Sequence, residues 1–388
     1  MAPGSIPEHR RHARRPPRSA RRRGLLAVGA AAVVAVIAVV VGMGGSPPAI
    51  HPAAAQTKPS HAPTTPAPTR TDSPSPTPQA TSAPASPTPL PTVAQTAVSM
   101  DGCPVAPADS IWRARVDQLP VAAHSSAYIA SIGADSHVHA DFGSGTWDGE
   151  PIGIPVTLIK PGTPPARISF DYADESDPGP YPIPTDALIE GGAQSTGDRH
   201  ILALDPSDCR DYELYDAVQS SAGVWHAGSG AIFTLTSDAL RPAGWTSADA
   251  AGLPILPGLA DYDEDAGGAI DHALRITVPR SQAAYLWPAR HDASGDTDPG
   301  LPPMGLRLRL KADVNISGLP PQARVIAQAL KTYGAIVADN GSAWYISGTQ
   351  DQRWDNDELA ALSALTGNDF EAVDTSSLEG SPNSAAVR

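Results

Sequence analysis

The chain has 388 residues and a formal net charge of −14, a length that allows one large domain or two ordinary ones. All 7 Trp, all 9 Tyr and all 4 Phe lie after residue 100, which excludes a fully disordered protein. Residues 1–99 hold 10 of the 27 Lys and Arg but only 2 of the 41 Asp and Glu, so the remainder carries a net charge of −22. This balance excludes a nucleic-acid-binding protein that works through a broad basic surface, because neutralising phosphates requires clustered Lys and Arg.

The first 44 residues predict an N-terminal membrane segment. Residues 1–23 form a basic tail with eight arginines, and residues 24–44 carry no charge. The stretch from Leu25 to Met43 would be roughly 29 Å long as a helix, close to the apolar thickness of a bilayer. The arginines predict a single-pass cell-membrane protein whose tail is cytoplasmic and whose C-terminal part lies outside. The alternative is a signal segment that is cleaved near Ala55, which would give a secreted protein.

Residues 45–99 predict a disordered linker between this segment and a folded domain. There are 14 Pro between residues 46 and 98, together with many Ser and Thr. Such a polyproline-type stalk could span roughly 160 Å at about 3.1 Å per residue. We therefore expect residues 100–388 to form an extracytoplasmic domain that works at a distance from the membrane. The alternative is a passive linker whose length matters little.

The two cysteines, Cys103 and Cys209, both fall in the part expected outside the cytoplasm. An oxidising compartment favours a disulfide between them. A zinc site is disfavoured because there is no second cysteine pair. A catalytic thiol is disfavoured because Cys209 has no local partner in the sequence.

The apolar runs beyond residue 100 are short and bounded by Pro, Gly and Asp. They predict a mostly β fold with a sandwich or jelly-roll-like core. In the sequence GLRLRLK the leucines alternate with Arg307, Arg309 and Lys311, which predicts a strand with one buried face. Strands are expected at residues 151–160, 166–172, 199–204, 211–217, 231–235, 273–278, 284–287 and 305–312.

Two or more short helices are expected beside these strands. Pro321 opens an apolar stripe that ends at Gly334, and an acidic cap precedes a second helix over 355–365. Further short helices are expected at 109–115 and 125–132. The Pro- and Gly-rich segments 174–197 and 239–268 are expected to be ordered loops, and such loops often carry function.

No nucleotide-binding, nucleophile-elbow or metalloprotease motif is present, so candidate catalytic residues must come from local patterns. Asp198 and His200 enter a predicted strand, and Glu213 lies on the return strand. If Asp205 and Asp208 close the hairpin, His200 stands opposite Glu213, and the pair could serve as a general acid or base. The alternative is a structural His–Glu pair on a half-buried sheet.

Two further histidine groups are weaker candidates. His272, at the start of another predicted strand, is a catalytic candidate with a structural role as its alternative. His137, His139 and Asp141 alternate along the chain and could meet one metal ion, although surface or capping histidines are the simpler interpretation. No cofactor is expected; calcium is the alternative, because carboxylates crowd two loops: Asp171, Asp174, Glu175 and Asp177, and Asp292, Asp296 and Asp298. Their spacing does not match an EF-hand, which favours solvated acidic loops.

Aromatic residues in loops predict a carbohydrate-binding surface, because exposed Trp faces suit the apolar faces of sugar rings. Trp245, Trp287 and Trp344, together with Arg199 and Arg275, are the predicted substrate-binding residues. Trp225 and Trp354 also lie in or beside loops. The alternative is that each Trp covers the core of a loop-rich domain.

Four blocks of sequence carry a resemblance to a known family. They are RPAGWTSADAAGLPILPGL from residue 241, DHALR from 271, WPARH from 287 and VADNGSAWYISG from 337. In these blocks the chain resembles a family of exported bacterial proteins over most of residues 105–378. No activity is known for that family. The resemblance therefore implies a single coherent domain and no particular reaction.

These observations predict a membrane-tethered protein that acts on an envelope or extracellular polysaccharide as a hydrolase or lyase. The alternative is a non-catalytic glycan- or cell-wall-binding module. An enzyme would hold paired carboxylates or a His–carboxylate pair in a cleft, whereas a binding module would present a flat aromatic platform. The expected partners are a polysaccharide or cell-wall glycan and the membrane, and no nucleic acid.

Overall fold

The structure, a computed structural model, describes residues 99, 100 and 102–388. The basic tail, the predicted membrane segment and almost all of the predicted linker lie outside the described residues, so the expected topology stays a prediction. Within the described part of the chain, no helix combines the length and the apolar character needed to span a bilayer.

The largest sheet has six strands in the order β17-β14-β15-β13-β16-β3. The central strands β13 and β15 run parallel, and β14 pairs antiparallel with β15. The strands are β3 (His139–Ala140), β13 (Leu274–Val278), β14 (Arg307–Leu310), β15 (Ala335–Asn340), β16 (Tyr345–Ile346) and β17 (Phe370–Val373).

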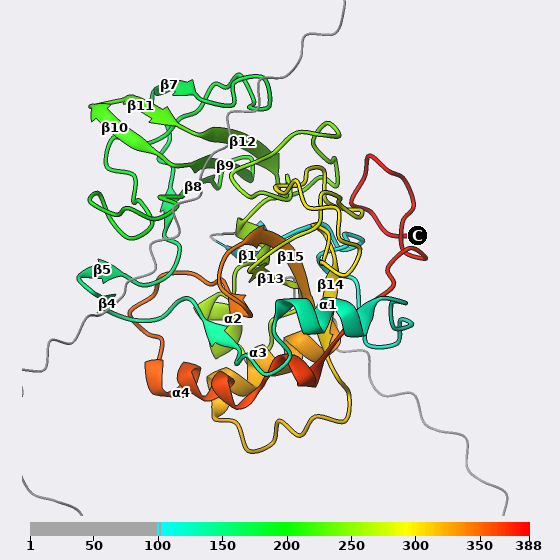
Figure 1. Cartoon of the computed structure of the whole chain (residues 1–388). Helices are drawn as coiled ribbons and strands as arrows, with labels where there is room; N and C mark the ends of the chain where they lie inside the picture. The colour runs from blue at the N-terminus through cyan, green and yellow to red at the C-terminus, as the bar shows by residue number, and fades with distance from the viewer. Residues whose placement is uncertain (1–98, 101) are drawn as a thin grey trace, which may run out of the picture. The chain divides into compact units, whose positions relative to one another are not determined.

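Helices pack against this sheet. α3 begins at Pro321, where a missing N–H costs nothing, and it buries Ile326 and Leu330. It contacts β14, while α1 contacts β17, and the helices lie together in the lower half of Figure 1. The helical elements of the described residues are α1 (Ser125–Ile132), α2 (Tyr262–Ala266), α3 (Pro321–Thr332), α4 (Asn356–Ala360) and the 3₁₀ turns η1 (Leu256–Gly258), η2 (Ala361–Ala364) and η3 (Gly367–Asp369).

Two smaller sheets form the upper half of Figure 1. One has the order β12-β9-β8-β6, and the other has the order β10-β11-β7. Their strands are β6 (Val156–Leu158), β7 (Arg167–Phe170), β8 (Ile201–Asp205), β9 (Arg210–Tyr215), β10 (Val218–Ser221), β11 (Val224–Ala227) and β12 (Ser229–Thr234). Two short ladders pair β1 (Ser99–Met100) with β2 (Cys103–Pro104) and β4 (Thr146–Trp147) with β5 (Glu150–Pro151).

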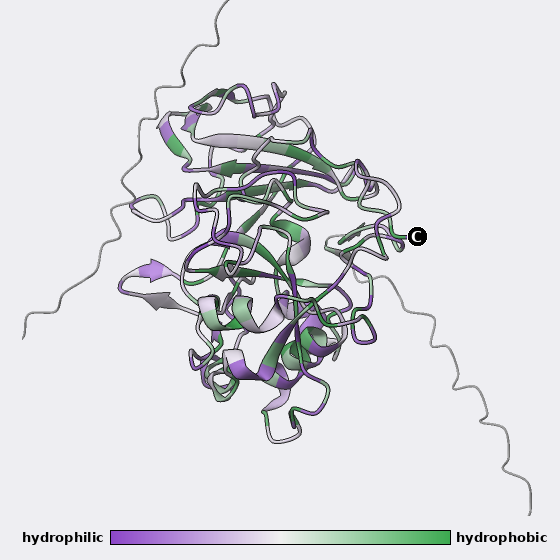
Figure 2. Ribbon diagram, turned by 45° about the vertical axis from the view of Figure 1, so that its right-hand side comes forward, coloured by the Kyte–Doolittle hydropathy of each residue, from purple (hydrophilic) through white to green (hydrophobic). Residues whose placement is uncertain are grey.

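Strand β8 is buried on both faces. Ile201 and Ala203 belong to one apolar cluster, and Leu202 and Leu204 belong to another, which also contains Cys103. A third and larger cluster lies between the six-stranded sheet and the helices. The alternation of side chains along a strand explains how four consecutive apolar residues serve two cores. Figure 2 shows these apolar stretches along the inner strands and helices, with polar residues more frequent in loops.

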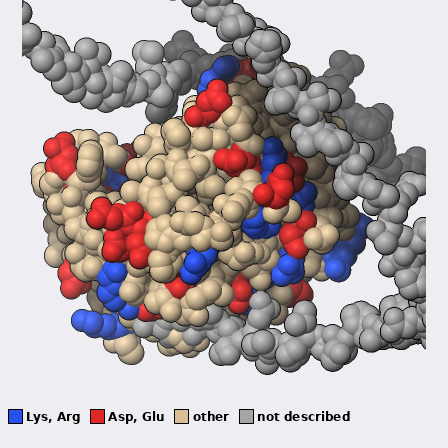
Figure 3. All heavy atoms as spheres, turned by 90° about the horizontal axis from the view of Figure 1, so that it is seen from below, with Lys and Arg blue, Asp and Glu red and all other residues tan. Residues whose placement is uncertain are grey.

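The prediction of a β-rich fold with short helices is confirmed. Helices pack on β14 and β17 of the six-stranded sheet, whereas residues of the four-stranded and three-stranded sheets share one apolar cluster. Residues 109–115 form no helix and residues 284–287 form no strand, whereas β15 and β17 are strands that the sequence patterns did not indicate. On the face that Figure 3 shows, acidic and basic side chains are interspersed among neutral ones.

The predicted disulfide is confirmed. Cys103 in β2 is bonded to Cys209 in the turn between β8 and β9, across 106 residues of sequence. Cys103 is fully buried beside Leu202 and Leu204. The bond therefore joins the start of the domain to the hairpin of the four-stranded sheet.

Replacing Cys103 with serine should destabilise the domain. In the chain-entropy model, a loop of this length contributes up to about 4–5 kcal/mol to the free energy of unfolding. Urea unfolding of the oxidised protein and of Cys103→Ser measures the difference. The wild type treated with a reductant serves as the matched control, and equal midpoints for all three samples would contradict the prediction.

Candidate functional site

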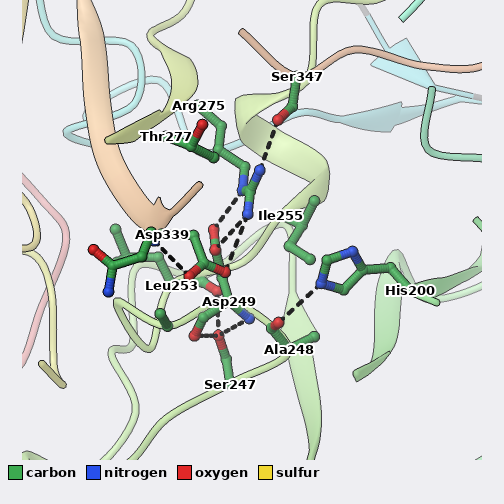
Figure 4. A network of polar contacts seen from close by, with 12 residues as sticks. His200, Ser247, Ala248, Asp249, Leu253, Ile255, Arg275, Thr277, Asp339 and Ser347 are labelled. Atoms are coloured by element: carbon green, nitrogen blue, oxygen red, sulfur yellow. Dashed lines mark hydrogen bonds and ion pairs between the residues drawn. The ribbon is translucent and has the colours of Figure 1, made fainter. Parts of the chain in front are cut away.

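A cluster of charged side chains lies where the six-stranded and four-stranded sheets meet. Arg275 comes from β13 and Asp339 from β15, while His200 immediately precedes β8. Residues 247–256, which we call the 247–256 loop, run between them (Figure 4). The cluster thus draws on both sheets and on one of the predicted long loops.

Arg275 is held rigidly by its neighbours. Its Nε and Nη2 atoms donate to the two carboxylate oxygens of Asp249 at 2.8 Å each, and Nη1 donates to Ser347 Oγ at 2.6 Å. The Asp249 side chain is 0% exposed and that of Arg275 is 5% exposed. A bidentate buried pair of this kind fixes both groups in one geometry.

Asp339 is the third member of this network and the one that reaches solvent. Its side chain is 21% exposed, and its Oδ2 lies 3.4 Å from Arg275 Nη2. Burial, followed by the nearby Asp249 charge, raises the pKa of Asp339 to about 7 despite the attraction of Arg275. Asp339 can therefore hold a proton near neutral pH.

A β-bulge brings Asp339 to Arg275. Ile276 pairs with Val337, but the next pair is Thr277 with Asp339, because the register shifts by one residue. Without that shift Asp339 would stand opposite Val278 and point to the other face of the sheet. The bulge thus places the carboxyl on the face that Arg275 occupies.

His200 forms a second ion pair in the cluster. Its Nδ1 lies 2.6 Å from Glu190 Oε2, and its Nε2 lies 3.2 Å from the backbone oxygen of Ala248. Burial alone would lower the pKa of His200, but the Glu190 carboxylate raises it to about 9. Burial alone would raise the pKa of Glu190, yet the His200 charge brings it below its usual range. Both ring nitrogens are engaged, so His200 is a positioning group rather than a free base.

Asp141, Asp198 and Tyr215 border the cluster. Asp141 and Asp198 are exposed. Desolvation by surrounding protein, followed by the Glu190 charge, raises the pKa of Asp141. Burial, followed by the Asp198 charge, raises the pKa of Tyr215 to about 12. The site thus combines exposed carboxylates with one carboxyl that retains its proton.

The predicted pairing of His200 with Glu213 is wrong. The observed register sets Glu213 opposite Leu202 and Asp205 opposite Arg210, because the turn between the strands has four residues rather than two. Glu213 is 0% exposed, and its Oε1 accepts N–H bonds from Ile255 at 2.7 Å and Leu256 at 3.0 Å. It is a buried anchor for the 247–256 loop.

The other histidine candidates do not come together in one site. His272 is buried, and its Nε2 lies 2.7 Å from Glu264 Oε2, which agrees with the structural role given as its alternative. His139 is exposed, stacks on Tyr345 with ring centroids 4.3 Å apart and influences Asp141. His137 instead contacts the Ser363 backbone oxygen. Within the described part of the chain, no group of three His, Cys, Asp or Glu side chains is arranged to hold a metal ion.

The predicted substrate-binding arginines are occupied by the protein itself. Arg199 is buried and donates to the backbone oxygens of Ala193, Ser195 and Ala217, which fixes the loop that carries Asp198. Arg275 is buried and donates to Asp249 and Ser347. Both predicted side chains are thus engaged in hydrogen bonds within the protein.

The expectation of exposed aromatic platforms is wrong for Trp344, which is 0% exposed and donates to Gly133 O. Trp225 and Trp354 are also buried. Trp287 is partly buried and donates to Ser384 O, and Trp245 is partly buried under the Arg241 guanidinium. Trp225, Trp287, Trp344 and Trp354 thus belong to or pack against the apolar core, as the alternative interpretation requires.

The acidic loops considered for calcium serve the fold in part. Asp177 forms an ion pair with Arg241, and Glu175 accepts the Thr246 N–H at 3.1 Å. Asp296 pairs with Arg280 at 2.6 Å. Several of the carboxylates expected to crowd around a cation thus have protein partners.

The cluster includes three residues that the sequence patterns missed: Glu190, Asp249 and Asp339. Asp249 and Asp339 lie inside the sequence blocks that resemble the family of exported bacterial proteins. This position is the sequence feature that could have indicated them. Trp147 was also missed; it is 81% exposed on the β4–β5 hairpin. The hairpin contacts the loop that carries Asp198, because Ser195 Oγ donates to Glu150 Oε2 at 3.3 Å.

A cavity of ≈ 260 Å³ between β12 and residues 105–112 has a separate, mainly apolar lining. None of Glu190, Asp198, His200 or Asp339 contributes to that lining. The cavity is therefore separate from the charged cluster.

Comparison of the chain with family models, curated proteins and solved structures finds no match. The functional argument therefore depends on the geometry and charge of the cluster.

Proposed function

We propose that this protein hydrolyses glycosidic bonds in an envelope or extracellular polysaccharide, with the charged cluster as its active site. The observation that carries the proposal is the environment of Asp339. Its carboxyl has a pKa of about 7 and lies near exposed carboxylates. Glycoside hydrolysis uses two carboxyl groups whose environments separate their pKa values. The cluster supplies such a set.

In this mechanism Asp339 is the general acid. It donates its proton to the glycosidic oxygen as the bond to the anomeric carbon breaks. Asp198, whose charge reaches Asp339, supplies the second carboxylate, which attacks the anomeric carbon or activates the water that does so. Asp249 fixes Arg275, which contacts Asp339, and the His200–Glu190 pair holds the loop that carries Asp198.

The charge balance favours a hydrolase over a lyase. A lyase that acts on uronic acids must neutralise the substrate's carboxylate before it removes the neighbouring proton. Here the carboxylates of Asp141, Glu190, Asp198 and Asp249 outnumber the cations Arg275 and His200, even with Asp339 neutral, and both cations are already paired. An anionic sugar would meet net repulsion at this site.

A non-catalytic binding module receives less support. Such a module needs a platform of several exposed aromatics, whereas Trp225, Trp344 and Trp354 are buried and Trp147 is the one exposed tryptophan of the described residues. The predicted anchor and stalk place the domain near envelope polysaccharides, which is the basis for the proposed substrate.

The test is the release of reducing ends from a panel of neutral, amino-sugar and uronic-acid polysaccharides by the full-length protein. We expect new reducing ends without unsaturated sugars from a member of the neutral or amino-sugar set, and loss of this activity in Asp198→Asn. Unsaturated products would identify a lyase. Binding of a glycan without cleavage would favour the binding module.

Trp147 should bind the polysaccharide next to the cluster. Its exposed ring on the β4–β5 hairpin suits stacking on a sugar unit that neighbours the cleaved one. Trp147→Ala should raise KM about tenfold, equivalent to about 1.4 kcal/mol, with little change in kcat. Trp147→Tyr, which keeps an aromatic face, is the matched control, and unchanged kinetics in the alanine variant would contradict this role.

A further inference from the structure

Two buried carboxyl groups lie away from the proposed reaction. Asp211 and Glu213 are two residues apart on β9, so both point to the same face, and both are 0% exposed. Across the strands they stand opposite Leu204 and Leu202 of β8, and Phe233 and Ala231 of β12. They are therefore surrounded by an apolar cluster rather than by countercharges.

Protein donors satisfy one of the four carboxyl oxygens. Glu213 Oε1 accepts the N–H groups of Ile255 and Leu256. Both oxygens of Asp211 and Oε2 of Glu213 are buried without a protein donor apart from each other's carboxyl. Tyr215 is a titratable side chain that packs against the same apolar cluster. Its pKa is raised by burial and by the charges of Asp198, Asp216 and Asp339.

Two adjacent carboxylates cannot both be ionised in such surroundings at a reasonable free-energy cost. A proton held between them would satisfy Oε2 of Glu213 and one oxygen of Asp211 and would remove the repulsion. Burial raises the pKa of Asp211 to about 7, and burial together with Asp211 raises the pKa of Glu213 well above its usual range. The burial of the pair and the raised pKa values both favour a pair that carries protons in the native state.

The pair is connected to the active-site cluster through the 247–256 loop. Ser247 Oγ donates to the backbone oxygen of Leu253 at 2.6 Å and accepts the Asp249 N–H at 2.9 Å, which makes the loop one hydrogen-bonded unit. One end of the unit is anchored to Glu213 through Ile255. The other end contacts His200 through Ala248 O and Arg275 through Asp249 (Figure 4).

We propose that Asp211 and Glu213 form a proton-sharing pair that acts as a pH-sensitive anchor of the 247–256 loop, so that loss of its protons at alkaline pH loosens the loop that positions Arg275 and His200. The pair does not take part in the reaction itself. The proposal concerns the fold and does not depend on which substrate the cluster uses.

The sign of the pH effect follows from linkage. A carboxyl whose pKa is higher in the folded state binds more protons when folded, so stability decreases as pH rises from about 4 towards 7. For Asp211 the folding equilibrium constant should fall by roughly tenfold per pH unit across that window. Stability should therefore be greatest on the acidic side.

The experiment compares urea unfolding of the full-length protein at pH 5 and pH 7 with that of Asp211→Asn. Between pH 5 and pH 7, the folding equilibrium constant of the wild type should fall by up to roughly a hundredfold more than that of the variant. Asp208→Asn, which removes an exposed carboxyl from the neighbouring turn, should keep the wild-type slope. Asp211→Leu, which suits the apolar surroundings, provides a second variant if the asparagine does not fold.

Hydrogen exchange of the Ile255 and Leu256 amides tests the link to the loop. From pH 6 to pH 8, after correction for intrinsic exchange, we expect the wild type to lose protection about tenfold more than Asp211→Asn. Parallel stability slopes in wild type and variant would overturn the proton-sharing pair. The stability slopes could differ as predicted while the two amides lose protection equally in wild type and variant. That result would overturn the role of the pair as a loop anchor.

Discussion

Replacing Asp339 with asparagine is expected to lower polysaccharide hydrolysis by about 100-fold or more, the usual scale for loss of a general acid. Asparagine is close to aspartic acid in shape but has no proton to give. The folded state should survive, because a neutral side chain replaces one that is half-protonated near pH 7. Initial rates of reducing-end release measure the effect.

The pH dependence of the wild type provides a companion test of the same residue. Asp339 must be protonated to act, so kcat/KM should fall as the pH rises through about 7. The matched control is Asp313→Asn, which removes an exposed carboxyl outside the cluster. An Asp339→Asn enzyme with more than a tenth of wild-type activity would contradict the acid assignment.

Replacing Arg275 with methionine is expected to cost about 3–5 kcal/mol of stability, the range for breaking a buried ion pair. The change leaves Asp249 with no countercharge at a position that is 0% exposed. It also removes the donor to Ser347 Oγ. Urea unfolding at neutral pH measures the loss.

A double variant separates charge from packing in this effect. Arg275→Met combined with Asp249→Asn should recover part of the lost stability, because the uncompensated charge is gone. Arg275→Lys keeps a charge but cannot make the bidentate contact, so it should fall between wild type and Arg275→Met. A single methionine variant within about 1 kcal/mol of wild type would show that the pair contributes little.

Much of the scaffold could be predicted from local patterns. The disulfide followed from having two cysteines in a chain expected outside the cytoplasm, and α3 followed from Pro321 and an apolar stripe. The alternating GLRLRLK segment predicted β14 but not its environment. Arg307 is 2% exposed and donates to the backbone oxygens of Tyr333 and Ile111, because neighbouring loops cover that face as well. Burial lowers the pKa of Arg307 to about 9.

The candidate site was harder to predict because it depends on register. The β8–β9 turn has two more residues than expected, which moves Glu213 from opposite His200 to opposite Leu202. The bulge between Ile276 and Thr277 decides which face Asp339 occupies, and no local pattern indicates it. Glu190 reaches His200 from a loop ten residues earlier, at a distance that only the folded chain defines.

Titration of the Asp339 carboxyl tests the central claim most directly. In protein with isotope-labelled aspartate side chains, the carboxyl signal that disappears in Asp339→Asn identifies this residue. We predict that this signal titrates with a pKa of about 7, as an acid that retains its proton near neutrality requires. A signal that titrates near the ordinary aspartate value of about 4 would contradict the assignment of Asp339 as the general acid and, with it, the proposed mechanism.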